Sequence, residues 1–368
     1  MQPVRELSES AVARARLHSL LLAGYQPSSF DQIATWFGAM QAQDAASGKW
    51  SLGVRLAGAQ ETDVDEAFER AEVVRTWPMR GTIHIVPARD VRWMLELTGI
   101  RALNASVARR RQLGLDVSEA ERGSAVLEAA LRETDRLTRT DCLAALQQAG
   151  IATDGQRGYH LLGYAAQTGV ICLGPNQGSE QTFALIDTWA PSQVRFERSE
   201  ALTELTFRFF RSHGPANMRD FAGWSGLTLT DVKAGVASNV GRLVPGSFRG
   251  GEVWLTKELD ERMDGIGRTR SAAVALPGFD EFILGYKDRS VQLGPDDFEQ
   301  VVPGGNGVFR PTLCIDGRAV GTWTRSIKRT EVVIEFVPFR PLSPQHMARA
   351  STAFDAFGQY LGRAVRLG

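Results

Sequence analysis

The sequence predicts an α+β fold of three tandem winged-helix (helix-turn-helix) units, followed by a strand-rich, β-barrel-like C-terminal part. Three helices, a strand, a glycine-rich turn and a second strand follow one another between residues 119 and 187. The same order recurs further along the chain, and apolar, strand-like runs dominate after residue 272. A helix-turn-helix followed by a hairpin is the order of a winged helix. Because a repeated unit determines the architecture of the whole chain, we prefer a fold of tandem repeats to other folds.

The clearest unit lies in the middle of the chain. Thr138 or Thr140 can cap its second helix, because a side-chain oxygen there accepts a hydrogen bond from a free backbone N–H group. Gly150 ends that helix as a C′ glycine would. The predicted elements are helices at residues 125–132, 141–149 and 156–167 and strands at 170–173 and 182–186.

Two further stretches follow the same order. The later one has predicted helices at residues 202–211, 217–225 and 230–237 and a hairpin of 243–248 with 252–255. The N-terminal one has predicted helices at residues 12–22, 30–40 and 65–72, an apolar run at 49–56, and strands at 73–77 and 82–86. Turn residues between the paired strands favour hairpins in both stretches.

The C-terminal part alternates strand-like runs with turns. Strands are predicted at residues 274–276, 308–315, 319–324 and 332–337, and a helix at 346–361 closes the chain. The chain is long enough for several packed units. We predict four domains, at residues 1–115, 116–195, 196–262 and 263–368.

Composition and charge limit the kinds of partner that the chain is expected to bind. The 368 residues include 42 basic and 42 acidic side chains, so the net charge of zero argues against a generic polyanion binder. Local clustering still permits DNA binding, because residues 101–111 hold four arginines and no acid. Neither an apolar run long enough to span a bilayer nor a signal-peptide pattern is present, so we expect a cytoplasmic protein with no membrane partner. We also expect a monomer.

No metal and no cofactor are expected. Cys142, Cys172 and Cys314 lie far apart in the chain, and the five histidines show no ligand spacing. A zinc or iron–sulfur site needs closer clustering. The sequence also lacks a phosphate-binding GxxxxGK[ST] loop and a GxSxG nucleophile elbow.

Two pairs of adjacent carboxylates suggest chemistry. Asp296-Asp297 follows a Leu-Gly-Pro segment, where a solvated turn is the simpler interpretation. Asp280-Glu281 is followed by Lys287, Asp288 and Arg289, so ion pairing among these charges competes with a role in glycoside hydrolysis or metal binding.

The segment Gln41-Ala42-Gln43 is predicted at the end of a helix and near several tryptophans. Alone it is unremarkable, but it resembles the Gln–apolar–Gln motif of AlkZ-type DNA glycosylases, a winged-helix family associated with self-resistance to crosslinking antibiotics. Three other segments resemble that family in the same order along the chain. They are residues 75–84, residues 276–289, and residues 310–312 through 321–323.

The resemblance implies a monofunctional glycosylase that removes N7-alkylated purines from double-stranded DNA, some family members also releasing interstrand crosslinks. It makes Gln41 and Gln43 the catalytic residues. An N7-alkylpurine is already a cationic leaving group, so the enzyme needs mainly to position water and stabilise positive charge on the sugar, which an amide oxygen can do. Asp44 is a less favoured participant, since a helix turns ~100° per residue and points it elsewhere. No lysine is placed for Schiff-base chemistry.

Candidate DNA contacts surround these segments. They are Arg75, Arg80, His84, Lys287, Arg289 and Arg310. His84 has an alternative interpretation, because it alternates with two isoleucines and can face solvent from a strand. Salt bridges are the alternative for the last three. The main alternative function is a winged-helix transcriptional regulator that performs no chemistry, and a third is a protein that sequesters a DNA-damaging drug.

Overall fold

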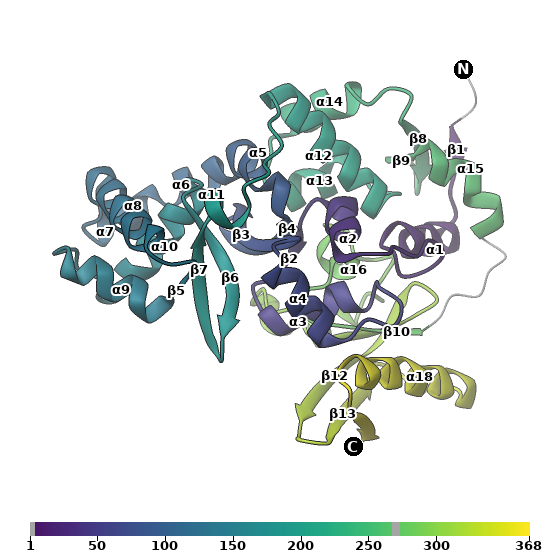
Figure 1. Ribbon diagram of the computed structural model, residues 1–368. Coiled ribbons are helices and arrows are strands. Elements are labelled where there is room, and N and C mark those ends of the chain that lie inside the picture. The colour runs from purple at the N-terminus through teal and green to yellow at the C-terminus, as the bar shows by residue number, and fades with distance from the viewer. Residues whose placement is uncertain (1–3, 267–272) are drawn as a thin grey trace. The chain divides into compact units, whose positions relative to one another are not determined.

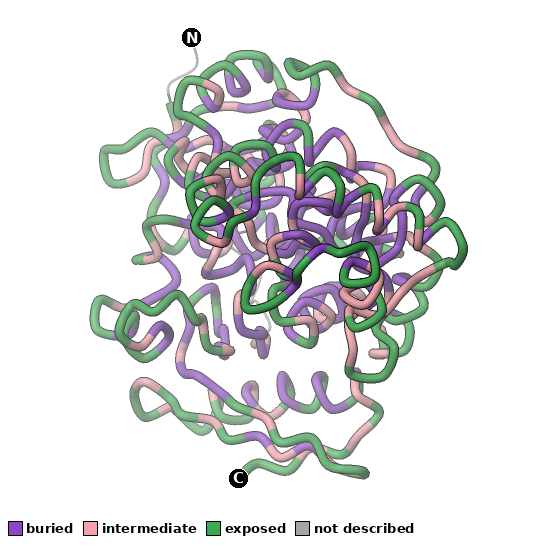
Figure 2. The backbone as a smooth tube through the Cα atoms, turned by 90° about the vertical axis from the view of Figure 1, so that its left-hand side faces the viewer, coloured by how far each residue is buried: buried purple, intermediate pink, exposed green. Residues whose placement is uncertain are grey.

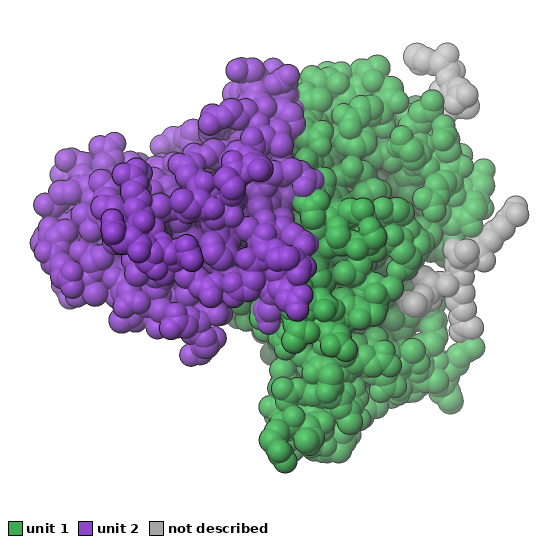
Figure 3. All heavy atoms as spheres, viewed as in Figure 1, with its two compact units in different colours: residues 1–64, 202–368 green, residues 65–201 purple. Residues whose placement is uncertain are grey.

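The computed structural model describes residues 4–266 and 273–368 (Figure 1), in two compact units. One unit combines Met1–Val64 with Leu202–Gly368, and the other is Asp65–Ala201 (Figure 3). Helices and strands are both abundant, which confirms the α+β class. The division into two units cuts the first predicted domain, and the four domains proposed from the sequence stay a prediction.

The first unit begins with β1 (Arg5–Glu6) and three helices, α1 (Glu9–Ser19), α2 (Phe30–Phe37) and α3 (Ala45–Gly53), with the short strand β2 (Met40–Gln41) between the last two. Serines cap the first two helices, as Ser8 accepts from Ala11 N and Ser29 from Gln32 N. Helix α2 ends three residues earlier than predicted. The cause is Gly38, whose φ of 82° leaves the helical region while its N–H still bonds to the carbonyl of Ala34.

The second part of this unit has the helices α12 (Arg198–His213), α13 (Met218–Ser225) and α14 (Leu229–Ala237). The hairpin β8 (Leu243–Phe248) and β9 (Gly251–Thr256) follows, and then α15 (Lys257–Ile266). Asn217 and Thr228 form capping boxes at the starts of α13 and α14. The order of three helices and a hairpin predicted here is therefore present, with β1 added in parallel to β8.

The C-terminal sheet curls into a half-barrel in the order β10-β11-β12-β13-β14. Its strands are β10 (Ala273–Leu276), β11 (Thr312–Ile315), β12 (Arg318–Ile327), β13 (Glu331–Pro338) and β14 (Ala364–Leu367), with the short helices α16 (Glu281–Leu284) and α17 (Phe298–Val301) and the 3₁₀ turn η3 (Pro303–Gly305) between the first two. Helix α18 (Pro344–Tyr360) packs against the sheet with one face, which includes buried Ala353, Phe354 and Phe357. Figure 2 colours the whole backbone by this burial. Trp323 lies 5.1 Å from the ring of Phe357 across this contact. The four predicted strands and the terminal helix are confirmed, while β14 is an addition.

The second unit contains α8 (Val117–Arg132), α9 (Arg139–Gln148) and α10 (Arg157–Gln167), with the hairpin β6 (Ile171–Gln177) and β7 (Glu180–Leu185). Within the unit the strands run in the order β4-β3-β6-β7-β5, where β3 is Val73–Met79, β4 is Thr82–Pro87 and β5 is Leu137–Thr138. Thr138 caps α9, as predicted. Apolar side chains from α8, α9, α10 and the strands share one core, which includes Leu127, Leu146, Leu161 and Phe183.

The sequence patterns gave no prediction for the helical run between residues 88 and 112 of the second unit. It comprises η1 (Ala88–Asp90), α5 (Val91–Met94), the π-helical turn η2 (Leu95–Gly99), α6 (Ile100–Ala105) and α7 (Val107–Gln112). At its centre the hydroxyl of Thr98 bonds to the carbonyls of Met94 and Pro78, which ties the run to the end of β3. The remaining helices are α4 (Glu61–Glu69), which spans the boundary between the units, and α11 (Ile186–Trp189).

None of the helices in the described ranges 4–266 and 273–368 is long and apolar enough to cross a membrane.

Candidate active site

Gln41 and Gln43 lie in an extended connection between α2 and α3, and the prediction that they end a helix is wrong. Met40 and Ala42 are fully buried, whereas Gln41 is half-buried and Gln43 is exposed. This alternation is that of extended chain, in which residues i and i+2 point to the same side. In a helix the two glutamines would lie about 200° apart. From this alternation of buried and accessible residues we infer that the two amides point to the same side, although β2 itself ends at Gln41.

The helix before this connection is held at its C-terminal end. The guanidinium of Arg211 donates to the carbonyls of Thr35 and Trp36, at 2.8 and 3.0 Å, and stacks on the Trp36 ring. Burial, together with the charge of neighbouring Arg208, lowers the pKa of Arg211 to about 10. A cation at the last carbonyls of a helix is favourable, so Arg211 helps to fix the point at which the chain leaves α2.

Glu281 holds the backbone of residues 41–43, which we call the glutamine segment. Its Oε1 accepts a hydrogen bond from the backbone N–H of Gln41 at 3.0 Å, and its Oε2 accepts one from the indole N–H of Trp224 at 2.9 Å. The imidazole Nε2 of His213 lies 3.2 Å from the same Oε2. Glu281, Trp224 and His213 are each 2 % exposed or less. A buried carboxylate thus connects the start of α16 to a residue 240 positions earlier.

Asp280, the neighbour of Glu281, forms a separate buried ion pair. Its two carboxylate oxygens face Nη1 and Nη2 of Arg55 at 2.8 and 2.9 Å, and Ser51 donates to it at 2.7 Å. Burial alone would raise the pKa of Asp280. The charge and hydrogen bonds of Arg55 outweigh burial, so the pKa lies below its usual value. Arg55 also donates to the carbonyls of Leu20 and Ser51, which joins α1, α3 and α16.

These contacts correct the expected pairing of the Asp280-Glu281 segment. Ion pairing is the right explanation for Asp280, but its partner is Arg55 and not the nearby Lys287 or Arg289. The other carboxylate pair also differs from expectation, because Asp297 is only 3 % exposed and accepts from Gly294 N and Arg340. A solvated turn is therefore wrong for Asp297.

Asp44 begins α3 and is exposed. Its Oδ1 accepts a hydrogen bond from Ser47 N at 2.7 Å, which is an N-cap contact. The carboxylate thus has a structural task at the helix terminus, directly after Gln43.

The three candidate DNA contacts of the second unit differ in exposure. Arg75 is 6 % exposed and donates to the side chain of Asn176 at 2.8 Å, and burial lowers the pKa of its guanidinium. His84 is fully buried with Nδ1 2.9 Å from the carbonyl of Thr82, so the solvent-facing alternative is wrong. Arg80 is exposed at the tip of the β3–β4 hairpin, where its φ of 55° and that of Gly81, 73°, close the turn.

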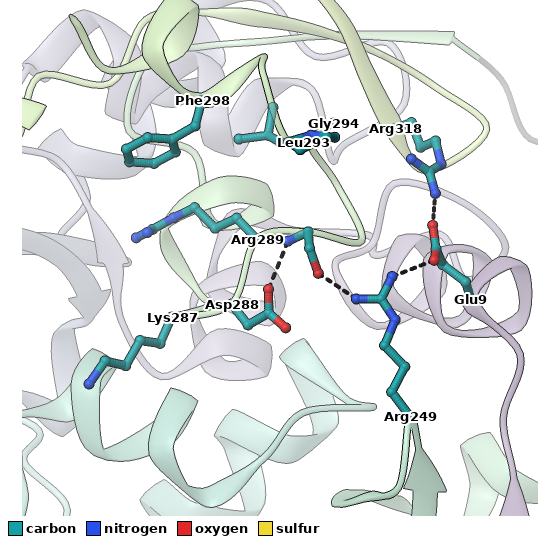
Figure 4. Close-up of a pocket in the computed structure, with 11 residues that line it drawn as sticks. Glu9, Arg249, Lys287, Asp288, Arg289, Leu293, Gly294, Phe298 and Arg318 are labelled. Atoms are coloured by element: carbon teal, nitrogen blue, oxygen red, sulfur yellow. Dashed lines mark hydrogen bonds and ion pairs between the residues drawn. The ribbon is translucent and has the colours of Figure 1, made fainter. Parts of the chain in front are cut away.

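Lys287 and Arg289 line a cavity of about 560 Å³ in the first unit (Figure 4). Arg249 and Arg318 contribute two more cations, and both pair with Glu9 on the opposite side of the cavity from Lys287. Arg289 donates from Nε to the carbonyl of Ile283 and stacks on aromatic rings. The ammonium of Lys287 makes no hydrogen bond or ion pair within the described part of the chain, although its backbone N bonds to Asp220.

Arg310 lies outside this cavity and is exposed. Its backbone N bonds to the carbonyl of Val301, and its Nη1 lies 3.3 Å from the carbonyl of Gln300. The six candidate contacts therefore fall into three classes: buried (Arg75, His84), cavity-lining (Lys287, Arg289) and exposed (Arg80, Arg310).

Sequence reasoning missed Arg55, His213 and Trp224. Nothing in their local patterns marks them, because each acts through a partner more than 50 positions away. The one usable signal was the unusual Asp280-Glu281 pair in an apolar segment, since buried carboxylates need partners.

The described residues hold no cluster of three or more side chains suited to a metal ion. Cys142, Cys172 and Cys314 are buried free thiols, and burial raises the pKa of Cys142 and of Cys172 to about 12. Such thiols are poor nucleophiles and poor metal ligands.

Comparisons with known proteins agree with this architecture. An interstrand DNA cross-link repair glycosylase from Streptomyces sahachiroi is 23% identical over 347 residues, which covers 89% of this chain and 91% of that protein. The solved structure of the Streptomyces sahachiroi DNA glycosylase AlkZ superimposes with a TM-score of 0.79 at 21% identity, covering 99% of this chain and 100% of the other. The family described as DNA glycosylase AlkZ-like matches residues 11–364. Because this match spans nearly the whole chain, the protein belongs to the AlkZ-like DNA glycosylase family.

Proposed function

We propose that the chain hydrolyses the N-glycosidic bond of N7-alkylated purines in double-stranded DNA, and that its substrates include purines crosslinked between the strands. The observation that carries the proposal is that Gln41 and Gln43 both lie outside the core, in a short segment between α2 and α3 whose backbone is held by buried Glu281. Family membership implies glycosylase action on DNA. The cross-link repair activity named for the Streptomyces sahachiroi relative supports the wider substrate range.

The proposed reaction is a hydrolysis. The oxygen of a water molecule bonds to the sugar C1′, the C1′–N9 bond breaks, and its electron pair neutralises the cationic purine as it leaves. A proton of the water passes to solvent. The amide oxygens of Gln41 and Gln43 orient this water and stabilise positive charge on the sugar, and dipoles placed in this way contribute on the order of 10²–10³ in rate. No cofactor takes part.

The exposure of the two glutamines supports a crosslink substrate. A crosslinked purine stays tethered to both strands and cannot swing into an enclosed pocket as a single damaged base does. Gln43 is exposed and Gln41 is half-buried, so both amides are accessible at a surface.

We infer that winged helices form the DNA-binding part of the protein. We also infer that four side chains contact DNA phosphates: Arg80, Lys287, Arg289 and Arg310. Arg75 and His84 are too buried for direct contact and are assigned to support of the β3–β4 hairpin. We place the protein in DNA repair or in self-resistance to an alkylating antibiotic, as a monomer in the cytoplasm.

The test is base release from defined duplexes. Incubation with DNA that contains one 7-methylguanine is expected to give free base and an abasic site, detected as strand cleavage by hot alkali. A crosslinked duplex is expected to yield two separable strands, and unmodified DNA should remain intact. Binding without abasic sites would instead indicate a transcriptional regulator, and binding of an alkylating drug without DNA binding would indicate sequestration.

Replacement of Lys287 by alanine is expected to weaken binding to duplexes of any sequence and to flatten its salt dependence. Each phosphate neutralised contributes a slope of about 0.9 in log K against log salt concentration, so one contact should remove roughly that amount. Fluorescence anisotropy on an undamaged duplex at several salt concentrations measures the slope.

Lys257→Ala is the matched control. Lys257 is equally an exposed lysine, but it begins α15, a helix with four acidic residues, where a phosphate would be repelled. Equal slopes for the two variants and the wild type would remove Lys287 from the DNA contacts.

A further inference from the structure

Glu281 occupies the point where the glutamine segment meets the core. On the basis of the function proposed above, we propose that Glu281 is a positioning residue for the reaction. Its carboxylate fixes the backbone N–H of Gln41, and the fixed backbone sets the direction of both glutamine side chains. Glu281 does not reach the substrate, because it is 1 % exposed.

The two carboxylate oxygens have separate tasks. Oε1 accepts from Gln41 N, while Oε2 accepts from Trp224 and faces His213. An ionised carboxylate accepts hydrogen bonds at both oxygens, whereas a glutamine side chain has only one acceptor oxygen. A glutamine at position 281 can therefore satisfy Gln41 or Trp224, but not both.

The partners of Glu281 are themselves immobilised. His213 stacks on Phe209 at 4.5 Å with an angle of 10° between the rings, and its ring edge meets Phe37 at the end of α2. A Cβ at Gly285 would lie 2.1 Å from His213 Cδ2, so the backbone of the residue after α16 is packed directly against the imidazole. This close packing holds His213 beside Oε2 of Glu281, while Oε1 faces the backbone N–H of Gln41.

Burial of a carboxylate is costly unless function or pairing compensates it. Neighbouring Asp280 has the full bidentate pairing of an arginine, whereas Glu281 accepts from an indole and from a backbone amide and lies beside an imidazole. A neutral core would be simpler to pack at this place. What the charge provides is a strong, directional acceptor for one backbone N–H of the proposed catalytic segment.

Glu281→Gln is the first test, with single-turnover base release and DNA affinity measured separately. The rate is expected to fall by about tenfold or more, because an unsatisfied buried donor displaces the segment, while the dissociation constant for DNA stays within about twofold. Hydrogen exchange at the Gln41 amide, followed by mass spectrometry, is expected to be slow in the wild type and faster in the variant. The added variant Glu281→Asp keeps the charge but shortens the reach, and it too is expected to lower the rate.

Two comparisons separate positioning from a general structural role. Asp297→Asn makes the same carboxylate-to-amide change at a residue that is 3 % exposed and has no contact with the glutamine segment, so it should keep the wild-type rate even where it lowers stability. In a Gln41→Ala background, Glu281→Gln should lower the rate of base release little further, since both changes act through the glutamine segment.

Full activity in a folded Glu281→Gln or Glu281→Asp protein would overturn the proposal, as would rapid exchange of the Gln41 amide in the wild type. Additive losses in the double variant would overturn it as well. If the wild type releases no alkylated base, the proposed function fails, and the exchange measurement still decides whether Glu281 holds the segment.

Discussion

Replacement of Arg55 by methionine is expected to lower the free energy of unfolding by about 3–5 kcal/mol. Methionine fills most of the volume of the arginine, so the loss arises mainly from the carboxylate of Asp280, which stays buried without its cation. The carbonyls of Leu20 and Ser51 also lose a donor. The side chains of Arg55 and Asp280 are 0% and 2% exposed, so solvent cannot compensate. Urea denaturation followed by circular dichroism measures the loss.

The pH dependence of this effect has a definite sign. Asp280 has a folded pKa below its usual value, so the pair contributes its stability above the unfolded pKa of about 3.9 and loses it as the pH falls through the folded pKa. In Arg55→Met the isolated Asp280 takes up a proton more readily. The difference in stability between wild type and variant should therefore be largest near neutral pH and shrink on acidification.

Arg70→Met provides the comparison at the surface. Arg70 pairs with Glu66 and Glu72, but its side chain is 57% exposed, and exposed pairs contribute little. Its replacement should leave the urea midpoint unchanged. Equal destabilisation by the two variants would contradict the assignment of a special role to the buried pair.

Much of the fold follows from local signals in the sequence. Thr138 marks the start of α9 through its side-chain acceptor, and Asn217 and Thr228 mark α13 and α14 through capping boxes. Most helices and hairpins predicted from apolar periodicity are present within a few residues of their expected bounds, but α8 begins at Val117 and not at residue 125. The run from η1 to α7 had no such caps: the flanking residues of its first four segments make no side-chain cap bond.

Only part of the candidate site could be predicted from such local signals. Gln41 and Gln43 stand out in the sequence, but their conformation depends on one glycine. Ala39 and Met40 are good helix formers, which favoured a helix to residue 40, whereas Gly38 adopts a positive φ and ends it at Phe37. A stricter interpretation of Gly38 as a C′ residue would have predicted the extended segment.

The contacts that hold this segment have no local signature. Glu281 and Gln41 are 240 positions apart, and Arg55 and Asp280 are 225 apart. Only the folded chain brings them together, and a single sequence cannot reveal such pairs. What the sequence does indicate is the need for partners, since two adjacent carboxylates in an apolar segment are unstable alone.

Replacement of Gln41 or Gln43 by alanine is expected to lower the single-turnover rate of base release by on the order of 10²–10³, while DNA affinity changes little. The amides act on the water and on the charge that develops at the sugar, so their contribution appears in the transition state and not in binding. Because both side chains act on one water and one sugar in the proposed reaction, the double variant should be scarcely slower than either single one.

Gln60→Ala is the matched control, an exposed glutamine ahead of α4 whose loss should leave the rate unchanged. Gln43→Glu adds a sharper comparison, because a carboxylate keeps the acceptor oxygen and can also take the proton from water. If positioning of water is the main contribution, Gln43→Glu should retain more activity than Gln43→Ala. Wild-type rates in both alanine variants would place the chemistry elsewhere, and parallel losses of rate and affinity would make the glutamines DNA contacts. The pair must be tested together, because the proposed reaction requires both amides to face one sugar.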